Sequence, residues 1–352
     1  MSIVNIAAVL YALQTLNHVW LAFNRLEYIP LFYYFTQAVG YLCVIFGMLV
    51  ILVSQRIRVQ KTYIALLIIP FTYYFMCIFH NYGRIEAVYE ELRRLIPISM
   101  LVLFNKKLKI KIFNLTYWIT QALNVLSLFM WTCYVFNINI GFERVLYYTA
   151  KSWGQGTYYI KWGIFAIWNS VSFSRLCGVF NEPGGLGTLC ALLFIARYSR
   201  SKFWEKAVLI LTGIFTFSLA FYFMIFIYAA LCLIKKDKRY IFLIVVLGIL
   251  FVNIPDIDWG NPMLNNLAER MKITDSGVAG NNRVDNKADE RLMTDGKYLF
   301  GYGYGVDISH VLSYKQLVLQ FGYVGFLFML FEWLYFALKH NNYRGGGGMD
   351  IF

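Results

Sequence analysis

The stretch KAVLILTGIFTFSLAFYFMIFIYAALCLI, residues 206–234, decides the topology that the sequence predicts. It is too long for one comfortable membrane-spanning helix and short for two, because one span needs roughly 20 apolar residues. Dense basic segments flank it, at residues 197–206 and 235–239. Basic segments of this kind are expected on one side of a bilayer. Residues 206–234 are therefore predicted to fold back as a hairpin of two short helices that turns near Phe217 and Ser218.

The composition is that of a polytopic membrane protein. Only 14% of the 352 residues are charged and 59% are hydrophobic, whereas a soluble domain carries about 25% charge. The net charge of +13 would suggest nucleic-acid binding in a soluble protein. Here the basic residues cluster in short segments between apolar runs, so no nucleic-acid partner is expected.

Other apolar runs extend this interpretation to an all-α protein with about ten transmembrane helices in a single membrane domain, residues 1–352. The further candidate spans are residues 3–23, 29–54, 62–80, 95–104, 112–136, 184–198, 240–253 and 312–338. If 206–234 were a single span, everything after it would invert. With the hairpin, two long loops face outward, residues 137–183 and 254–311.

The first candidate site is RLCGVFNEPGGLGT, residues 175–188. Pro183 suits the first position of a helix, and the amide groups at that helix start favour an anion. Arg175, Asn181 and Glu182 come just before it. Two interpretations stay open for Arg175: it binds an anion, or it is a structural arginine paired with Glu182.

The second candidate site is RVDNKADERLMTDGKYLFGYGYG, residues 283–305. Arg283, Lys287 and Arg291 recur every four residues, which places them on one face of a helix. That face is either a solvated surface or a second anion site. The glycines at 301, 303 and 305 alternate with Tyr302 and Tyr304, without the preceding strand that a dinucleotide-binding motif requires.

His310 follows five residues after the glycine run and precedes the last apolar stretch. An imidazole that is neutral near pH 7 can accept a proton, so His310 is the candidate general base. An isolated histidine at such a place is also common as a structural residue. Asp307 is the rival for the base, although a carboxylate is the weaker base at neutral pH unless it is buried.

Together these segments resemble the O-antigen polymerases of the Wzy type and the O-antigen ligases, integral-membrane glycosyltransferases of the GT-C class. The resemblance covers roughly residues 170–335. It rests on an arginine–glycine–asparagine–proline motif, an arginine 18 residues before a Leu-x-Gly-x-Gly turn, and a histidine ahead of Gly-x-x-Gly. The matching residues are Arg175, Gly178, Asn181, Pro183, Arg283, Gly301, His310, Gly322 and Gly325.

The resemblance implies a polymerase that joins oligosaccharide repeat units carried on undecaprenyl diphosphate, with inversion and without a metal or other cofactor. It implies an inner-membrane, multi-pass location with the site facing the periplasm. Arg175, Arg283 and His310 are the expected catalytic residues. The expected diphosphate- or glycan-binding residues are Arg291, Lys287, Glu182, Asn181, Tyr302 and Tyr304. Lipid-linked donor and acceptor, membrane lipid and a chain-length regulator protein are the expected partners.

Two alternatives stay open. A ligase would transfer the glycan to lipid A core. The interval from His310 to Gly322 is one residue longer than in the ligases, which favours the polymerase. A flippase for lipid-linked oligosaccharides would place charges along many helices. In this sequence the charges gather in the segments between apolar runs.

Overall fold

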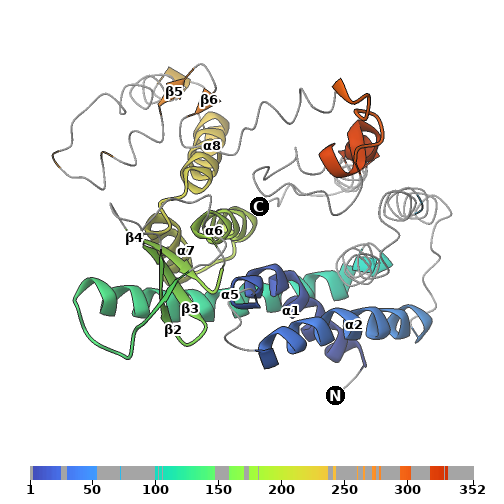
Figure 1. Cartoon of the computed structure of the whole chain (residues 1–352), viewed down its shortest axis with the longest axis horizontal. Helices are drawn as coiled ribbons and strands as arrows, with labels where there is room; N and C mark the ends of the chain where they lie inside the picture. Colours follow the sequence, from blue (N-terminus) through green and yellow to red (C-terminus); the bar gives the residue numbers. More distant parts are fainter. Residues whose placement is uncertain are drawn as a thin grey trace. The chain divides into compact units, whose positions relative to one another are not determined.

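The computed structural model divides into two compact units. The first comprises residues 1–11, 39–110 and 282–351, and the second comprises residues 12–38 and 111–281 with residue 352 (Figure 1). The described residues are 3–24, 30–53, 72, 100–101, 103–104, 106–146, 158–169, 174–180, 182–236, 241–242, 260, 265, 272–274, 277–278, 294–302, 318–328 and 330–331.

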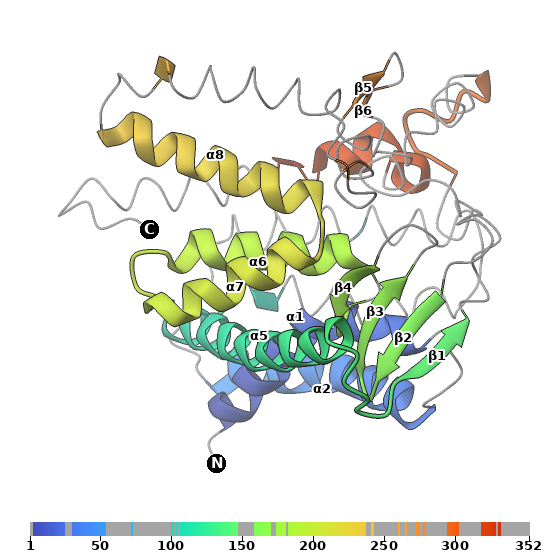
Figure 2. The same cartoon turned by 90° about the vertical axis from the view of Figure 1, so that its left-hand side faces the viewer.

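Helices dominate the described residues, and a small sheet interrupts them. The helices are α1 (Ile3–Asn24), α2 (Pro30–Val53), α5 (Lys106–Val135), α6 (Pro183–Arg197), α7 (Phe203–Phe215) and α8 (Leu219–Lys236). The strands are β1 (Glu143–Leu146), β2 (Tyr158–Trp162), β3 (Phe165–Asn169), β4 (Ser174–Gly178), β5 (Ile273–Thr274) and β6 (Gly277–Val278). Figure 2 shows α5, α6 and α7 side by side, with the sheet at one end.

Strands β1 to β4 form an antiparallel meander in chain order. Strands β2 and β3 are joined by a tight turn whose first central residue, Gly163, has a φ of 56°, a value that favours glycine. The register between β3 and β4 shifts between Ala166 and Ile167, since Ala166 pairs with Gly178 while Ile167 pairs with Leu176. The extra residue is Cys177, so β4 carries a bulge here.

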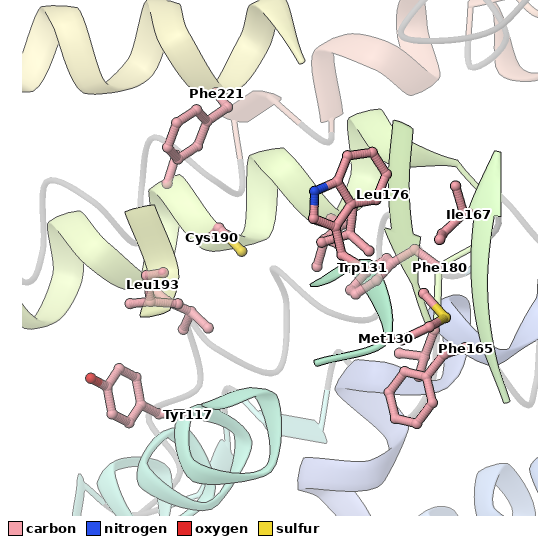
Figure 3. Packing of buried hydrophobic residues seen from close by; sticks show 14 residues of the cluster. Tyr117, Met130, Trp131, Phe165, Ile167, Leu176, Phe180, Cys190, Leu193 and Phe221 are labelled. Atoms are coloured by element: carbon pink, nitrogen blue, oxygen red, sulfur yellow. The ribbon is translucent and has the colours of Figure 1, made fainter. Parts of the chain in front are cut away.

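Side chains of β3 alternate between two hydrophobic clusters, as a strand requires. Phe165 and Ile167 join the main core with the helices, whereas Ala166 and Trp168 join a smaller cluster on the other face. Figure 3 shows Trp131 of α5 close to Leu176 of β4, with Ile167 nearby. Each fully buried large apolar side chain here contributes about 1.5–3 kcal/mol.

Residues 206–234 lie in two helices, α7 and α8, that meet near Phe217 and Ser218 as the sequence predicts, but the expectation that the two helices cross a membrane was wrong. The turn lies at Phe217, whose φ of 46° is unusual for a residue other than glycine. Helix α6 packs against both arms of the hairpin. The contact between α6 and the turn is close, because a Cβ on Gly187 would lie 2.6 Å from the Cβ of Ser218.

The all-α fold class was wrong. Residues 137–183, predicted as a loop, contain all four strands of the main sheet. Neighbouring side chains of β3 lie on opposite faces of the sheet, and both faces are apolar at residues 165–168, so no polar–apolar alternation marks this strand in the sequence.

The ten transmembrane helices were also wrong. Of the helices in the part of the chain that the structure describes, none combines the length and the apolar character that crossing a membrane demands. Helices α6 and α7 have 15 and 13 residues, which at 1.5 Å per residue is about 20 Å, short of a hydrocarbon core of about 30 Å. Helix α5 starts with four lysines among its first six residues.

This finding also corrects the multi-pass inner-membrane location with a site facing the periplasm. Apolar runs were counted as spans because composition does not distinguish lipid contact from protein contact. In the structure, many of these side chains pack against other helices and the sheet. The predicted spans 62–80, 95–104, 240–253 and 312–338 fall largely or partly outside the described residues.

We predict that Gly187→Ala destabilises the protein by about 1–3 kcal/mol, the usual cost of forcing extra volume into a packed contact. Besides Ser218, the new methyl group would meet the Thr216 hydroxyl at 2.7 Å. Thermal or urea unfolding measures the change. Gly184→Ala, on the same helix, is the control, because its methyl group would be 3.7 Å from the nearest atom. Equal stability of the two variants would contradict the close packing.

Candidate functional site

Arg175 lies on β4, in the second unit, and its guanidinium holds the turn between α7 and α8. Its Nε donates to the carbonyl oxygen of Thr216 at 2.9 Å, and its Nη2 donates to that of Phe217 at 3.1 Å. Its guanidinium carbon is 5.6 Å from the ring centre of Trp168 on β3. The side chain is buried. The two bonds supply donors to carbonyls that follow the last turn of α7, where the helix leaves such groups without partners.

Other polar groups stabilise the same turn. The Thr216 hydroxyl donates to the Gly213 carbonyl at 2.6 Å, and the Tyr222 hydroxyl donates to that of Ile214 at 2.9 Å. Burial raises the pKa of Tyr222 to about 12, and the positive charge of Arg175 opposes this increase. The phenol is therefore a neutral donor near pH 7. Arg175 is thus one member of a hydrogen-bonded cluster, and its described contacts are structural.

The start of α6 is positioned as the sequence predicts, with Pro183 in the first turn. Glu182 is the N-cap residue in an extended conformation, and its side chain makes no capping hydrogen bond. Its Oε1 is 3.7 Å from where a Cβ of Gly184 would lie, so the carboxylate stands beside the first turn. A carboxylate there interacts favourably with the helix dipole. Glu182 thus occupies the position that was predicted to attract an external anion, and Asn181 lies outside the described residues.

The second candidate site belongs to the first unit. Only part of it is described: Tyr302 is, whereas the others lie outside the described residues. Those outside are Arg283, Lys287, Arg291, Tyr304, Asp307 and His310. Arg175 and Glu182 belong to the second unit.

The Gly301–Gly322 junction is defined by residues 298–302, at the end of the described part of the second site, and by residues 319–324. Both glycines have positive φ, 73° and 66°. A Cβ on Gly301 would lie 2.6 Å from the Gln320 carbonyl oxygen. A Cβ on Gly322 would overlap the Leu299 carbonyl. Only glycine fits at both positions, because the two backbone segments are in direct contact.

Backbone hydrogen bonds join the two sides of this junction. The amide of Tyr302 donates to the Leu319 carbonyl at 2.7 Å, and that of Tyr323 donates to the Tyr298 carbonyl at 2.9 Å. The predicted Leu-x-Gly-x-Gly and Gly-x-x-Gly motifs are therefore parts of one structural feature. It joins the two ends of residues 303–317, the segment that contains His310.

Tyr302 was predicted to bind glycan, and the structure gives it internal partners. Its hydroxyl donates to Oδ2 of Asp295 at 2.6 Å, and Nζ of Lys297 is 5.0 Å from its ring centre. Asp295 and Lys297 were not among the predicted site residues. Asp295 is seven residues before Tyr302, a spacing that would place both on one face of a helix, but residues 295–302 form turns, so helical periodicity does not explain the contact. No family model, curated protein or solved structure matches the chain.

We predict that Arg175→Met lowers the free energy of unfolding by about 3 kcal/mol, because hydrogen bonds from a charged group contribute about 1.5–3 kcal/mol each and are not additive. Arg175→Lys should recover part of this, since it keeps the charge without the planar fork. Chemical unfolding measures both variants, with Arg200→Met, an exposed arginine, as the control. Wild-type stability of Arg175→Met together with lost anion binding would identify Arg175 as an anion ligand.

We predict that Gly322→Ala destabilises the first unit more than Gly296→Ala. Both glycines have positive φ, 66° and 63°, so both variants have the same backbone strain of about 1–2 kcal/mol. A Cβ on Gly296 would meet nothing within 4 Å, whereas one on Gly322 would meet the backbone of Leu299 and Phe300. Hydrogen exchange of the Tyr302 and Tyr323 amides measures the difference. Equal protection in the two variants would contradict the junction.

Proposed function

We propose that this protein is a glycosyltransferase that polymerises oligosaccharide repeat units carried on undecaprenyl diphosphate. The observation that carries the proposal is the Gly301–Gly322 junction. It unites two of the motifs on which the resemblance rests and holds together the ends of the segment that contains His310. Arg283 comes 18 residues before Gly301 in the sequence. Catalytic residues are typically carried by loops that a rigid scaffold positions.

The proposed reaction is a single displacement at the anomeric carbon of the donor sugar. A hydroxyl oxygen of the acceptor sugar forms a bond to that carbon, while the bond from the carbon to the diphosphate oxygen breaks. The bonding pair leaves with the diphosphate, so the anomeric centre inverts. The hydroxyl proton passes to the imidazole of His310. Undecaprenyl diphosphate, an already activated leaving group, is released without a further cofactor.

Arginine is suited to the departing diphosphate because its planar guanidinium makes paired hydrogen bonds to phosphate oxygens. We assign this role to Arg283, with Arg291 and Lys287 at the same helical spacing as further cations. Stabilising charge that develops as a bond breaks is commonly worth about 3–4 kcal/mol per donor. Arg175 has its described bonds to the carbonyls of Thr216 and Phe217, so its proposed part is positioning of the α7–α8 turn.

The purified protein with a synthetic undecaprenyl-diphosphate-linked repeat unit tests this function. We predict a ladder of longer glycans on gels and release of undecaprenyl diphosphate in equal proportion to the bonds formed. Arg283→Ala should reduce turnover by about 100-fold or more, the usual effect of removing a donor to developing charge. His310→Ala should reduce turnover while donor binding is kept, and the wild-type rate should fall as acidification protonates the imidazole.

Arg144→Ala is the matched control for Arg283→Ala, because Arg144 is an exposed arginine of the second unit, on β1. Turnover by His310→Ala together with inactive Asp307→Asn would transfer the role of base to the carboxylate. Transfer of glycan to lipid A core without a ladder would replace the polymerase with a ligase. Normal polymer from Arg283→Ala would refute the assignment of the donor site.

A further inference from the structure

The connection between α6 and α7 has an unusual charge distribution that the proposed reaction does not use. Between residues 183 and 236 the sequence has a single acidic residue, Glu205, and a group of cations around the connection. Those cations are Arg197, Arg200, Lys202 and Lys206. Placement on one side of a bilayer between two spans does not account for this basic segment, because none of the described helices is long and apolar enough to cross a membrane.

Glu205 does not neutralise the cations at the surface. Its side chain is 3% exposed, and its Oε2 accepts a hydrogen bond of 2.8 Å from the Tyr117 hydroxyl on α5. Its own backbone carbonyl accepts a 3.0 Å bond from Gln121. The carboxylate is therefore turned into the helix packing. Arg200 and Lys202, by contrast, are exposed.

Arg197 is also directed inward. Its Nη1 donates to Asn114 at 3.0 Å, and its guanidinium carbon is 4.1 Å from the ring centre of Tyr117. Such cation–π and hydrogen-bond contacts hold the group on α5. The cations that the surface presents are thus Arg200, Lys202 and the half-buried Lys206.

Aromatic side chains stand among these cations. Phe203 is 86% exposed and Trp204 is 47% exposed, at the start of α7. The rings of Trp204 and Trp118 are 6.2 Å apart, and Nζ of Lys206 is 4.2 Å from the ring centre of Tyr198. We call this set the basic–aromatic surface: Trp118, Tyr198, Arg200, Lys202, Phe203, Trp204 and Lys206.

We infer that the basic–aromatic surface docks on the face of a bilayer that contains anionic phospholipid. Lysine and arginine are attracted to the phosphates of such a face, and phenylalanine and tryptophan favour the boundary between headgroups and acyl chains. Because the Glu205 carboxylate is buried, it does not repel the negatively charged lipid phosphates as an exposed carboxylate would. Phe203 follows directly after the exposed cations Arg200 and Lys202, and this arrangement matches a partner that offers negative charge above an apolar layer. The inference is independent of the proposed glycosyl transfer.

Flotation of the purified protein with vesicles tests the docking. Vesicles of phosphatidylcholine with 30 mol% phosphatidylglycerol are expected to bind it, and pure phosphatidylcholine vesicles to bind it far less. Raising the salt concentration should weaken binding, because it screens exposed charges. Arg200→Gln and Lys202→Gln should each weaken vesicle binding about fivefold, the contribution of one cation near such a face. Lys272→Gln, at an exposed lysine outside the surface, is the control and should not change binding.

The apolar part of the contact has its own readout. In vesicles containing brominated phosphatidylcholine, tryptophans that enter the boundary region are quenched. Trp204→Phe should remove part of the quenching, whereas Trp131→Phe should not, since Trp131 is buried in the core. Phe203→Ala should weaken binding, and Phe223→Ala, at an exposed phenylalanine of α8, should leave it unchanged.

Several results would overturn the inference. One is equal binding to vesicles with and without phosphatidylglycerol, and another is equal loss of binding in Phe203→Ala and Phe223→Ala. Displacement from vesicles by millimolar inorganic phosphate would show a phosphate site in place of a bilayer contact. Tighter binding to a DNA oligonucleotide than to the anionic vesicles would make nucleic acid the partner.

Discussion

The second unit depends on the hydrogen bonds from Arg175 to the turn between α7 and α8. They join the last strand of the sheet to the helical hairpin through two backbone carbonyls, those of Thr216 and Phe217. Helix α6, which follows β4 directly, then has to pass the same turn. It does so at Gly187, where no side chain fits between the helix and Ser218. The packing around this one turn thus depends on the charge of Arg175, the positive φ of Phe217 and the missing side chain of Gly187.

These two hydrogen bonds also explain why an arginine is tolerated among apolar side chains. A buried guanidinium is costly unless its donors are satisfied, and backbone carbonyls at the end of α7 are acceptors that otherwise need partners. The guanidinium supplies the donors that the carbonyls lack, and the carbonyls supply the acceptors that the guanidinium needs. The same logic applies to Glu205, whose buried carboxylate accepts from Tyr117. In this unit, buried charge acts mainly in holding helices and sheet together.

The sequence predicted what depends on local pattern. The bounds of α1, α2 and α6 agree with the apolar runs to within one or two residues, and the hairpin at Phe217 was predicted from length and flanking charge. It did not predict the sheet, because pairing β1 to β4 needs partners across loops of different length. The partners of Arg175 are about 40 residues away, and Tyr302 meets Asp295 through a run of turns and not through a helix or strand. At the glycines of 301 and 322 the motif was visible, but their direct contact was not.

The bulge at Cys177 fixes the register of β4, so the number of residues in the strand determines which side chains lie on each face of the sheet. Arg175 faces Trp168 and Leu176 faces Ile167, and the additional residue absorbs the difference before Gly178 pairs with Ala166. Because strand side chains alternate, removal of that one residue would exchange the faces on one side of the bulge. Either the arginine would turn away from the hairpin, or the start of α6 would rotate with Pro183. The number of residues between Arg175 and Pro183 is therefore constrained as strictly as the identity of those residues.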